Sequence, residues 1–216
     1  GARDQIRAVG SSTVYPFATA VAEQTLVIAA ANVGDEALTT QVADLLLTRG
    51  DEASEVWARA ALGRLMLVQD RPEAAVEQFA LLRDRIGPVN RSFAQFEADE
   101  AEALVRAGRI DAARCLLPAL EADAAARGAW SRGQLRRILA LLATDIDDAS
   151  AHFAAARDEF ASTDNKVALG IAELTWGEWL RRAKRRAEAR RHLERAIEVF
   201  GLAGAVGLRR RAEKEL

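Results

Sequence analysis

Apolar residues recur along this chain at the three- and four-residue spacings of amphipathic helices, in one segment after another. The pattern predicts helices over residues 16–32, 36–49, 52–69, 72–86, 91–107, 111–127, 130–143, 147–162, 165–183, 187–200 and 205–215. Helix-ending glycines fall between these segments or at their ends: Gly34, Gly50, Gly87, Gly108, Gly128 and Gly201. Pro118 lies inside the segment 111–127, so we expect it to kink or split that helix.

The helical segments form a repeat. Four stretches share a small residue followed four positions later by a large apolar one: RPEAAVEQFALL, RIDAARCLLPAL, DIDDASAHFAAA and RAEARRHLERAI. The alignment stacks Ala75, Ala113, Ala149 and Ala189, followed by Phe79, Leu117, Phe153 and Leu193, with 38, 36 and 40 positions between the large residues. A weaker fifth copy, DEALTTQVADLL, places Leu38 and Val42 in the same register. Each alanine lets the partner helix approach, and the pairs must stack because one pair cannot bury its apolar face alone.

Two copies carry the offsets of a known repeat. They resemble the tetratricopeptide repeat through Leu62, Gly63, Met66, Ala75, Phe79 and Leu82, and again through Trp176, Gly177, Leu180, Ala189, Leu193 and Ala196. The middle copies lack the first-helix glycine, and the period of 36–40 exceeds the usual value of about 34, so the repeat is divergent. The resemblance implies an all-α fold, a right-handed superhelical solenoid of about five helix–turn–helix repeats.

Residues 25–216 as a whole resemble the helical-repeat region of large ATP-binding LuxR-type transcriptional regulators, the group that includes the maltose regulator. The stretch LTWGEWLRRAKRRAEARRHLERAIEVFGLAGAVGLRRRAEKEL is similar to the last repeat before their DNA-binding domain. In that family the repeats receive an inducer or a protein partner. The resemblance therefore implies a cytoplasmic sensor or interaction region that binds a protein, a peptide or a small-molecule inducer, without a cofactor. The chain has no G-x-x-x-x-G-K-[ST] phosphate loop, and we expect this region to make no direct contact with nucleic acid.

Residues 1–24 differ from everything that follows. The stretch RDQIRAVGSSTVYPFATAVAEQ resembles the mature N-terminus of periplasmic phosphate-binding proteins of ABC transporters. That resemblance implies an anion-binding loop of Ser11, Ser12 and Thr13 at a helix N-terminus, and by itself a periplasmic location. Two other interpretations stay open: an atypical cap that supplies the front of the first repeat helix, or a fused peptide held in the repeat groove of a chimera.

Composition adds limits to these functions. The formal net charge of −2 gives no global reason to expect nucleic acid, although residues 1–130 hold 13 Lys/Arg against 19 Asp/Glu and residues 131–216 hold 17 against 13. No stretch of 18 apolar residues is present, so no membrane span is predicted. The single Cys115 cannot form an intrachain disulfide, and we expect it to be a small buried hydrophobe.

The groove between the first helices of the pairs is the expected binding site. Counting one position beyond the matched glycines places Arg64 and Glu178 in equivalent groove positions, with Glu102 in the second copy. The full candidate set is Arg64, Gln95, Glu102, Glu178, Trp179 and Arg181. His152 and His192 are expected to be packing or surface residues. The sequence shows no acid–base pair, nucleophile arrangement or metal-ligand cluster, so it predicts a binding protein rather than an enzyme.

Overall fold

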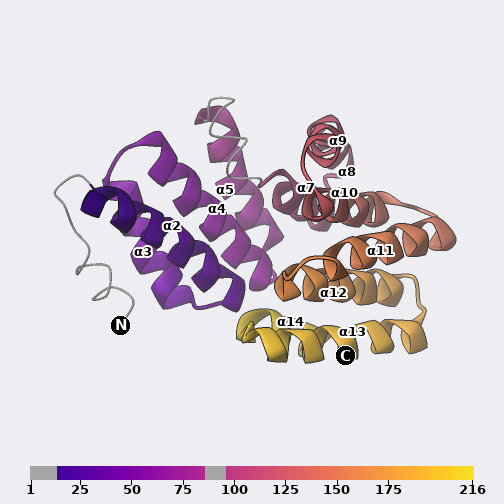
Figure 1. Cartoon of the computed structure of the whole chain (residues 1–216). Helices are drawn as coiled ribbons and strands as arrows, with labels where there is room; N and C mark the ends of the chain where they lie inside the picture. Colours follow the sequence, from indigo (N-terminus) through magenta and orange to yellow (C-terminus); the bar gives the residue numbers. More distant parts are fainter. Residues whose placement is uncertain (1–13, 86–95) are drawn as a thin grey trace.

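The computed structural model of the chain describes residues 14–85 and 96–216. Within these ranges all regular structure is α-helical, and each helix packs on its neighbours along the chain, which confirms the expected all-α helical-repeat solenoid (Figure 1). The helices are α2 (Val14–Val33), α3 (Glu36–Thr48), α4 (Glu52–Val68), α5 (Pro72–Arg85), α7 (Glu97–Arg106), α8 (Ile110–Arg114), α9 (Leu117–Ala126), α10 (Ala129–Leu142), α11 (Ile146–Ala161), α12 (Lys166–Arg182), α13 (Arg186–Ala203) and α14 (Val206–Glu215).

Short polar side chains begin several helices. Those of Asp35, Asp51, Asp145 and Asn165 accept hydrogen bonds from N–H groups of the first turn of α3, α4, α11 and α12. Such caps satisfy donors that have no partner within the helix. They hold the turns between helices short, so that consecutive helices pack against each other.

One turn geometry ends several helices. After α2, α4, α7, α12 and α13 a residue with positive φ lets the following N–H return to a carbonyl of the last helical turn; these residues are Gly34, Asp70, Gly108, Lys184 and Gly204. The prediction that Gly201 ends its helix was wrong, because α13 continues through it to Ala203 and Gly204 makes the left-handed turn instead.

Most of the stacked positions of the repeat lie in the core. Ala75 and Phe79 are fully buried, and a Cβ atom built on Gly63 of α4 would lie 2.6 Å from Cζ of Phe79. The same arrangement recurs in the last copy, where a Cβ on Gly177 would lie 2.7 Å from Cγ of Leu193. The glycine of the first helix therefore receives the large side chain of the second, which explains why both matched copies carry this pair.

Pro118 splits its helix, as predicted. The second helix of that copy is divided into α8 and α9, with Pro118 in the first turn of α9, where a missing N–H costs little. The division changes which side chains face the core, and Leu117 is only half-buried. Cys115 lies in the link and is exposed, so the expectation of a buried thiol was wrong.

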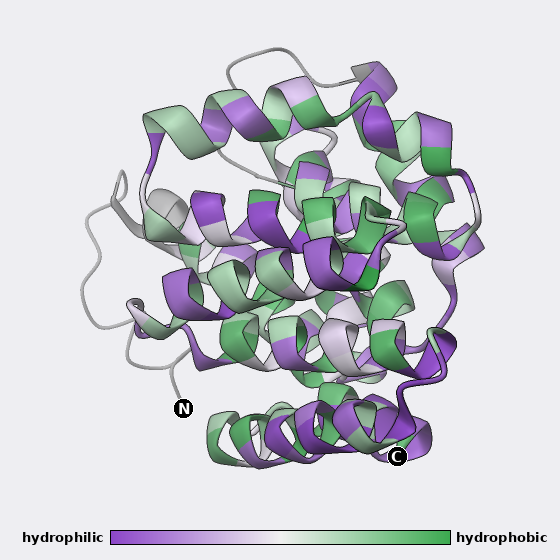
Figure 2. Ribbon diagram, turned by 90° about the vertical axis from the view of Figure 1, so that its right-hand side faces the viewer, coloured by the Kyte–Doolittle hydropathy of each residue, from purple (hydrophilic) through white to green (hydrophobic). Residues whose placement is uncertain are grey.

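The first helices of the pairs contact one another side by side: α2, α4, α7, α10, α12 and α14. Figure 1 shows the chain curving from α2 through α7 and α10 and back to α14. Since α14 also contacts α2 and α4, this row of helices, here called the inner ring, closes on itself. Figure 2 shows hydrophilic and hydrophobic residues interspersed along the helices of the structure. The second helices α3, α5, α11 and α13 lie outside the ring. Each packs on the first helix that precedes it in the chain and on the first helix of the next pair.

Candidate functional site

The inner ring surrounds a group of charged side chains that we call the charged centre. It comprises Arg64, Asp99, Glu102, Arg106, Arg137, Glu178 and Arg211. The side chains come from α4, α7, α10, α12 and α14, and therefore from every copy of the repeat after the first. Repetition explains part of the convergence, because Arg64, Glu102 and Glu178 hold equivalent positions of successive first helices and face the same axis.

Arg211 of α14 connects three other helices of the inner ring, α4, α7 and α12. Its Nε donates to Oε1 of Glu178 and its Nη2 to Oε2 of Glu178, both at 2.8 Å, in a bidentate pair. Nη2 also donates to Oε1 of Glu102 at 3.2 Å, and Nη1 donates to the carbonyl of Leu67 at 3.1 Å. Arg211 is buried, and the charges of the two carboxylates more than offset the effect of burial and raise the pKa of its guanidinium.

Glu102 is the carboxylate on which the charged centre converges. Besides Arg211, it accepts from Arg106 and pairs with Arg137, and its carboxyl is almost fully buried. Burial alone would raise its pKa, but the charges of Arg137, Arg211 and Arg106 more than offset burial and lower the pKa from 4.5 to about 2. Glu102 is therefore ionised at neutral pH inside the protein.

Helix α7 brings an unusual density of acidic groups into the interior. Its buried carboxylates are Glu97, Asp99, Glu100 and Glu102. Asp99 accepts from Nε of Arg64 at 2.9 Å, and Glu100 pairs with Arg83 of α5. Arg106, at the end of α7, pairs with Asp70 and donates to the carbonyl of Leu67 at 3.3 Å. The last turn of α4 thus receives two guanidinium groups, Arg106 and Arg211, in agreement with the preference of helix C-termini for cations.

The structure brings three of the six predicted groove residues together. Arg64, Glu102 and Glu178 belong to the charged centre, where Glu102 and Glu178 are buried against α14. Arg181 lies at the rim, half exposed, and pairs with Glu215 of α14 at 2.9 Å. Trp179 is half-buried and packs against the apolar cluster between α10, α11 and α12. Gln95 and the anion-loop candidates Ser11, Ser12 and Thr13 lie outside the described residues.

Sequence reasoning missed four members of the charged centre: Asp99, Arg106, Arg137 and Arg211. Two of them leave a signal in the sequence. Arg211 stands with Leu208 and Ala212 at spacings of three and four, which places an arginine on the buried face of its helix. Arg137 precedes Phe153 by 16 residues, as Gly63 precedes Phe79, so a charged residue replaces the repeat's glycine on the inner ring.

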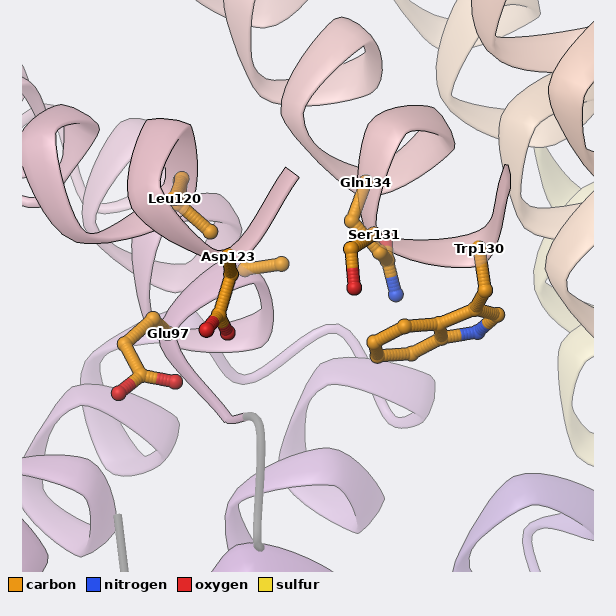
Figure 3. Close-up of a pocket in the computed structure, with 7 residues that line it drawn as sticks. Glu97, Leu120, Asp123, Trp130, Ser131 and Gln134 are labelled. Carbon is orange, nitrogen blue, oxygen red and sulfur yellow. The ribbon is translucent and has the colours of Figure 1, made fainter. Parts of the chain in front are cut away.

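A small pocket lies beside the inner ring, between α7, α9 and α10 (Figure 3). It is lined by Glu97, Ala98, Leu120, Asp123, Trp130, Ser131 and Gln134. The carboxylates of Glu97 and Asp123 lie on one side and the indole of Trp130 on the other. The space admits about one water molecule, so the pocket can take a single small group but not a whole ligand.

The histidines lie away from the charged centre. His192 stacks on Trp176 with ring centroids 3.8 Å apart, and its Nδ1 is 2.7 Å from Oε2 of Glu173. His152 lies 3.6 Å from the carboxylate of Asp148 on the same helix. Across residues 14–85 and 96–216, no three His, Cys, Asp or Glu side chains gather in a way that could hold a metal ion.

Comparison of the chain with protein-family models and with curated proteins found no match. In the part of the chain that the structure describes, no helix is both long and apolar enough to span a bilayer.

Proposed function

We propose that this chain is a partner-binding helical-repeat module, the sensor or interaction region of a LuxR-type transcriptional regulator in the cytoplasm. Its proposed role is to bind a protein segment rather than to catalyse a reaction. The sequence resemblance of residues 25–216 supports the family, and the helical-repeat architecture supports the class of function. A small-molecule inducer is the second ligand class that the resemblance implies.

The observation that carries this proposal is the way the inner ring holds α14. Four hydrogen bonds from one guanidinium reach residues of three other first helices, namely Leu67, Glu102 and Glu178. The inner ring thus already binds a helical segment through charge-assisted hydrogen bonds and close packing. Helix-in-groove recognition uses the same two elements, with the charges fixing register and partner choice.

The rim of the inner ring is where an external partner would first make contact. Arg181 is half exposed there and pairs with Glu215 of α14. Aromatic and arginine side chains contribute most of the binding energy in many protein interfaces. We therefore expect partner binding to depend on Arg181 and to be insensitive to charges on the outer helix α13.

Selection of displayed random peptides against the whole chain tests this function. The selected peptides should lose at least about tenfold in affinity for Arg181→Glu, because a rim cation becomes an anion. Arg190→Glu is the matched control, since Arg190 is exposed on α13 and pairs only locally with Glu194. Peptides whose binding is equally sensitive to both changes, or to neither, would contradict a partner site on the inner ring.

A further inference from the structure

The surface of the inner ring that α14 covers has a defined composition. We call it the α14 docking surface, and it is formed by Val33, Gly34, Leu67, Val68, Glu102 and Glu178. We infer that this surface is a binding site for an arginine-bearing amphipathic helix of a partner protein, and that α14 is its exchangeable occupant in the free chain. The inference rests on the proposed function and specifies the chemistry of the partner.

Shape restricts what can lie on the docking surface. A Cβ atom on Gly207 of α14 would come within 2.7 Å of Cα of Gly34, and within 2.8 Å of the Val33 carbonyl oxygen and of Cγ1 of Val68. The two backbones therefore touch, and only glycine fits at this position of the docked helix. Leu208 and Ala212 complete the apolar part of the same face, and both are buried. A partner helix needs glycine, leucine, arginine and alanine in this register.

Charge restricts the partner further. Two buried carboxylates, Glu102 of α7 and Glu178 of α12, face α14 and accept hydrogen bonds from Arg211. Arg211 supplies the cation for Glu178 and part of the charge that balances Glu102. Removing α14 would leave Glu178 without its bidentate partner. A helix that replaces α14 must therefore bring a guanidinium, because a compact ammonium cannot bond both oxygens of Glu178 and two further acceptors in the same geometry.

The contacts of α14 determine which helix can occupy the docking surface more than they add to the stability of the fold. Its buried side chains are Leu208, Arg211 and Ala212, whereas Arg209, Arg210, Glu213 and Lys214 are exposed. A buried ion pair adds little net stability compared with apolar packing, because both charges lose their hydration. Helix α14 also follows α13 after a single turn at Gly204, so it stays near its surface while another helix competes for it.

Gly207→Ala is the variant that separates docking from helix formation. Alanine favours a helix over glycine, so α14 should remain helical, but its Cβ would collide with the backbone of Gly34 and displace α14 from the docking surface. Gly201→Ala is the matched control, because a Cβ there has its nearest neighbour at 3.9 Å. Hydrogen exchange of the α4 and α14 amides reports whether α14 has been released.

A labelled synthetic peptide of residues 204–216 is the probe, titrated against the whole chain by fluorescence anisotropy. It should bind Gly207→Ala at least about tenfold more tightly than the unmodified chain or Gly201→Ala, since the intact occupant competes in the latter two. The same peptide carrying Arg211→Met should not bind. Equal affinity of the peptide for all three chains, or indifference to its arginine, would overturn the inference.

A second variant keeps the test decisive if Gly207→Ala does not fold. In Arg211→Met the docking surface lacks its cation, and the peptide should supply one and raise the melting temperature of that variant but not of the unmodified chain. If neither variant binds the peptide, another helix does not replace α14 on the docking surface, and the inference is refuted. If displayed peptides still bind in an Arg181-dependent way, the proposed function survives that failure; if they do not, both proposals fail.

Discussion

Glu102→Gln gives a sharp test of the electrostatics inside the inner ring. The substitution removes one negative charge and leaves the surrounding arginines in place, so glutamine stands in for protonated glutamate. The pKa of Glu102 is lowered from 4.5 to about 2, mainly because Arg137, Arg211 and Arg106 outweigh the effect of burial. One pKa unit corresponds to about 1.4 kcal/mol, so the ionised form should contribute about 3 kcal/mol to the free energy of unfolding.

The sign of the pH dependence follows from the direction of the shift. A carboxyl whose folded-state pKa lies below its unfolded value stabilises the fold above the unfolded pKa, and this contribution is lost as pH falls through the folded pKa. Glu102→Gln should therefore be less stable than the unmodified chain by about 3 kcal/mol at pH 7. At pH 3 the difference should shrink to about half of that value, because the unfolded chain is then protonated and the folded one only partly so.

Urea unfolding followed by circular dichroism at pH 7, 5 and 3 measures both quantities. Glu198→Gln is the control, because Glu198 is exposed on α13 and pairs only with Arg195 three residues before it. Because the pair is exposed, Glu198→Gln should change the free energy of unfolding by less than about 1 kcal/mol at every pH. Equal stability of the two variants at pH 7, or a pH-independent difference between Glu102→Gln and the unmodified chain, would show that the surrounding arginines do not stabilise the ionised Glu102.

Three further predictions concern the fold. Gly63→Ala should lower the free energy of unfolding by about 1–3 kcal/mol because the new methyl group meets the ring of Phe79, whereas Gly201→Ala, in an open helical position, should raise it by about 0.5–1 kcal/mol; urea unfolding of the pair checks both. Asp51→Ala should cost about 1 kcal/mol at neutral pH through loss of the α4 cap, and less at pH 3, since the hydrogen bonds from Ser54 lower the pKa of Asp51. Cys115 should react with a maleimide in the native chain without denaturant, as an exposed thiol does, and slow labelling that requires urea would show that it is buried.

Local sequence patterns predicted most of the fold. Periodicity and glycines indicated helices whose described ends the structure places within a few residues, and Pro118 indicated the division of one of them; the predicted start at residue 91 lies outside the described residues. The errors have local causes: α13 passes through Gly201 because the next glycine makes the left-handed turn, and Cys115 is exposed because it lies in the link that Pro118 helps to create.

The candidate site was only half predictable for a different reason. Counting from the repeat glycines found Arg64, Glu102 and Glu178, because equivalent positions of successive repeats face one axis. Arg211 and Leu67, which are in contact, lie 144 residues apart in the chain. Their contact depends on the small rotation between each helix pair and the next, which accumulates along the solenoid until α14 meets α2 and α4. No local pattern determines that sum.

The bidentate pair of Arg211 and Glu178 is the contact that fixes α14 of the inner ring to α12. A double-mutant cycle with Arg211→Met, Glu178→Gln and both together, followed by urea unfolding at pH 7, measures the coupling energy of this pair. Docked α14 predicts a coupling of about 2 kcal/mol or more, as expected for two buried charges that share two hydrogen bonds. A coupling below about 0.5 kcal/mol would mean that the two substitutions act independently, and that α14 does not close the inner ring in solution.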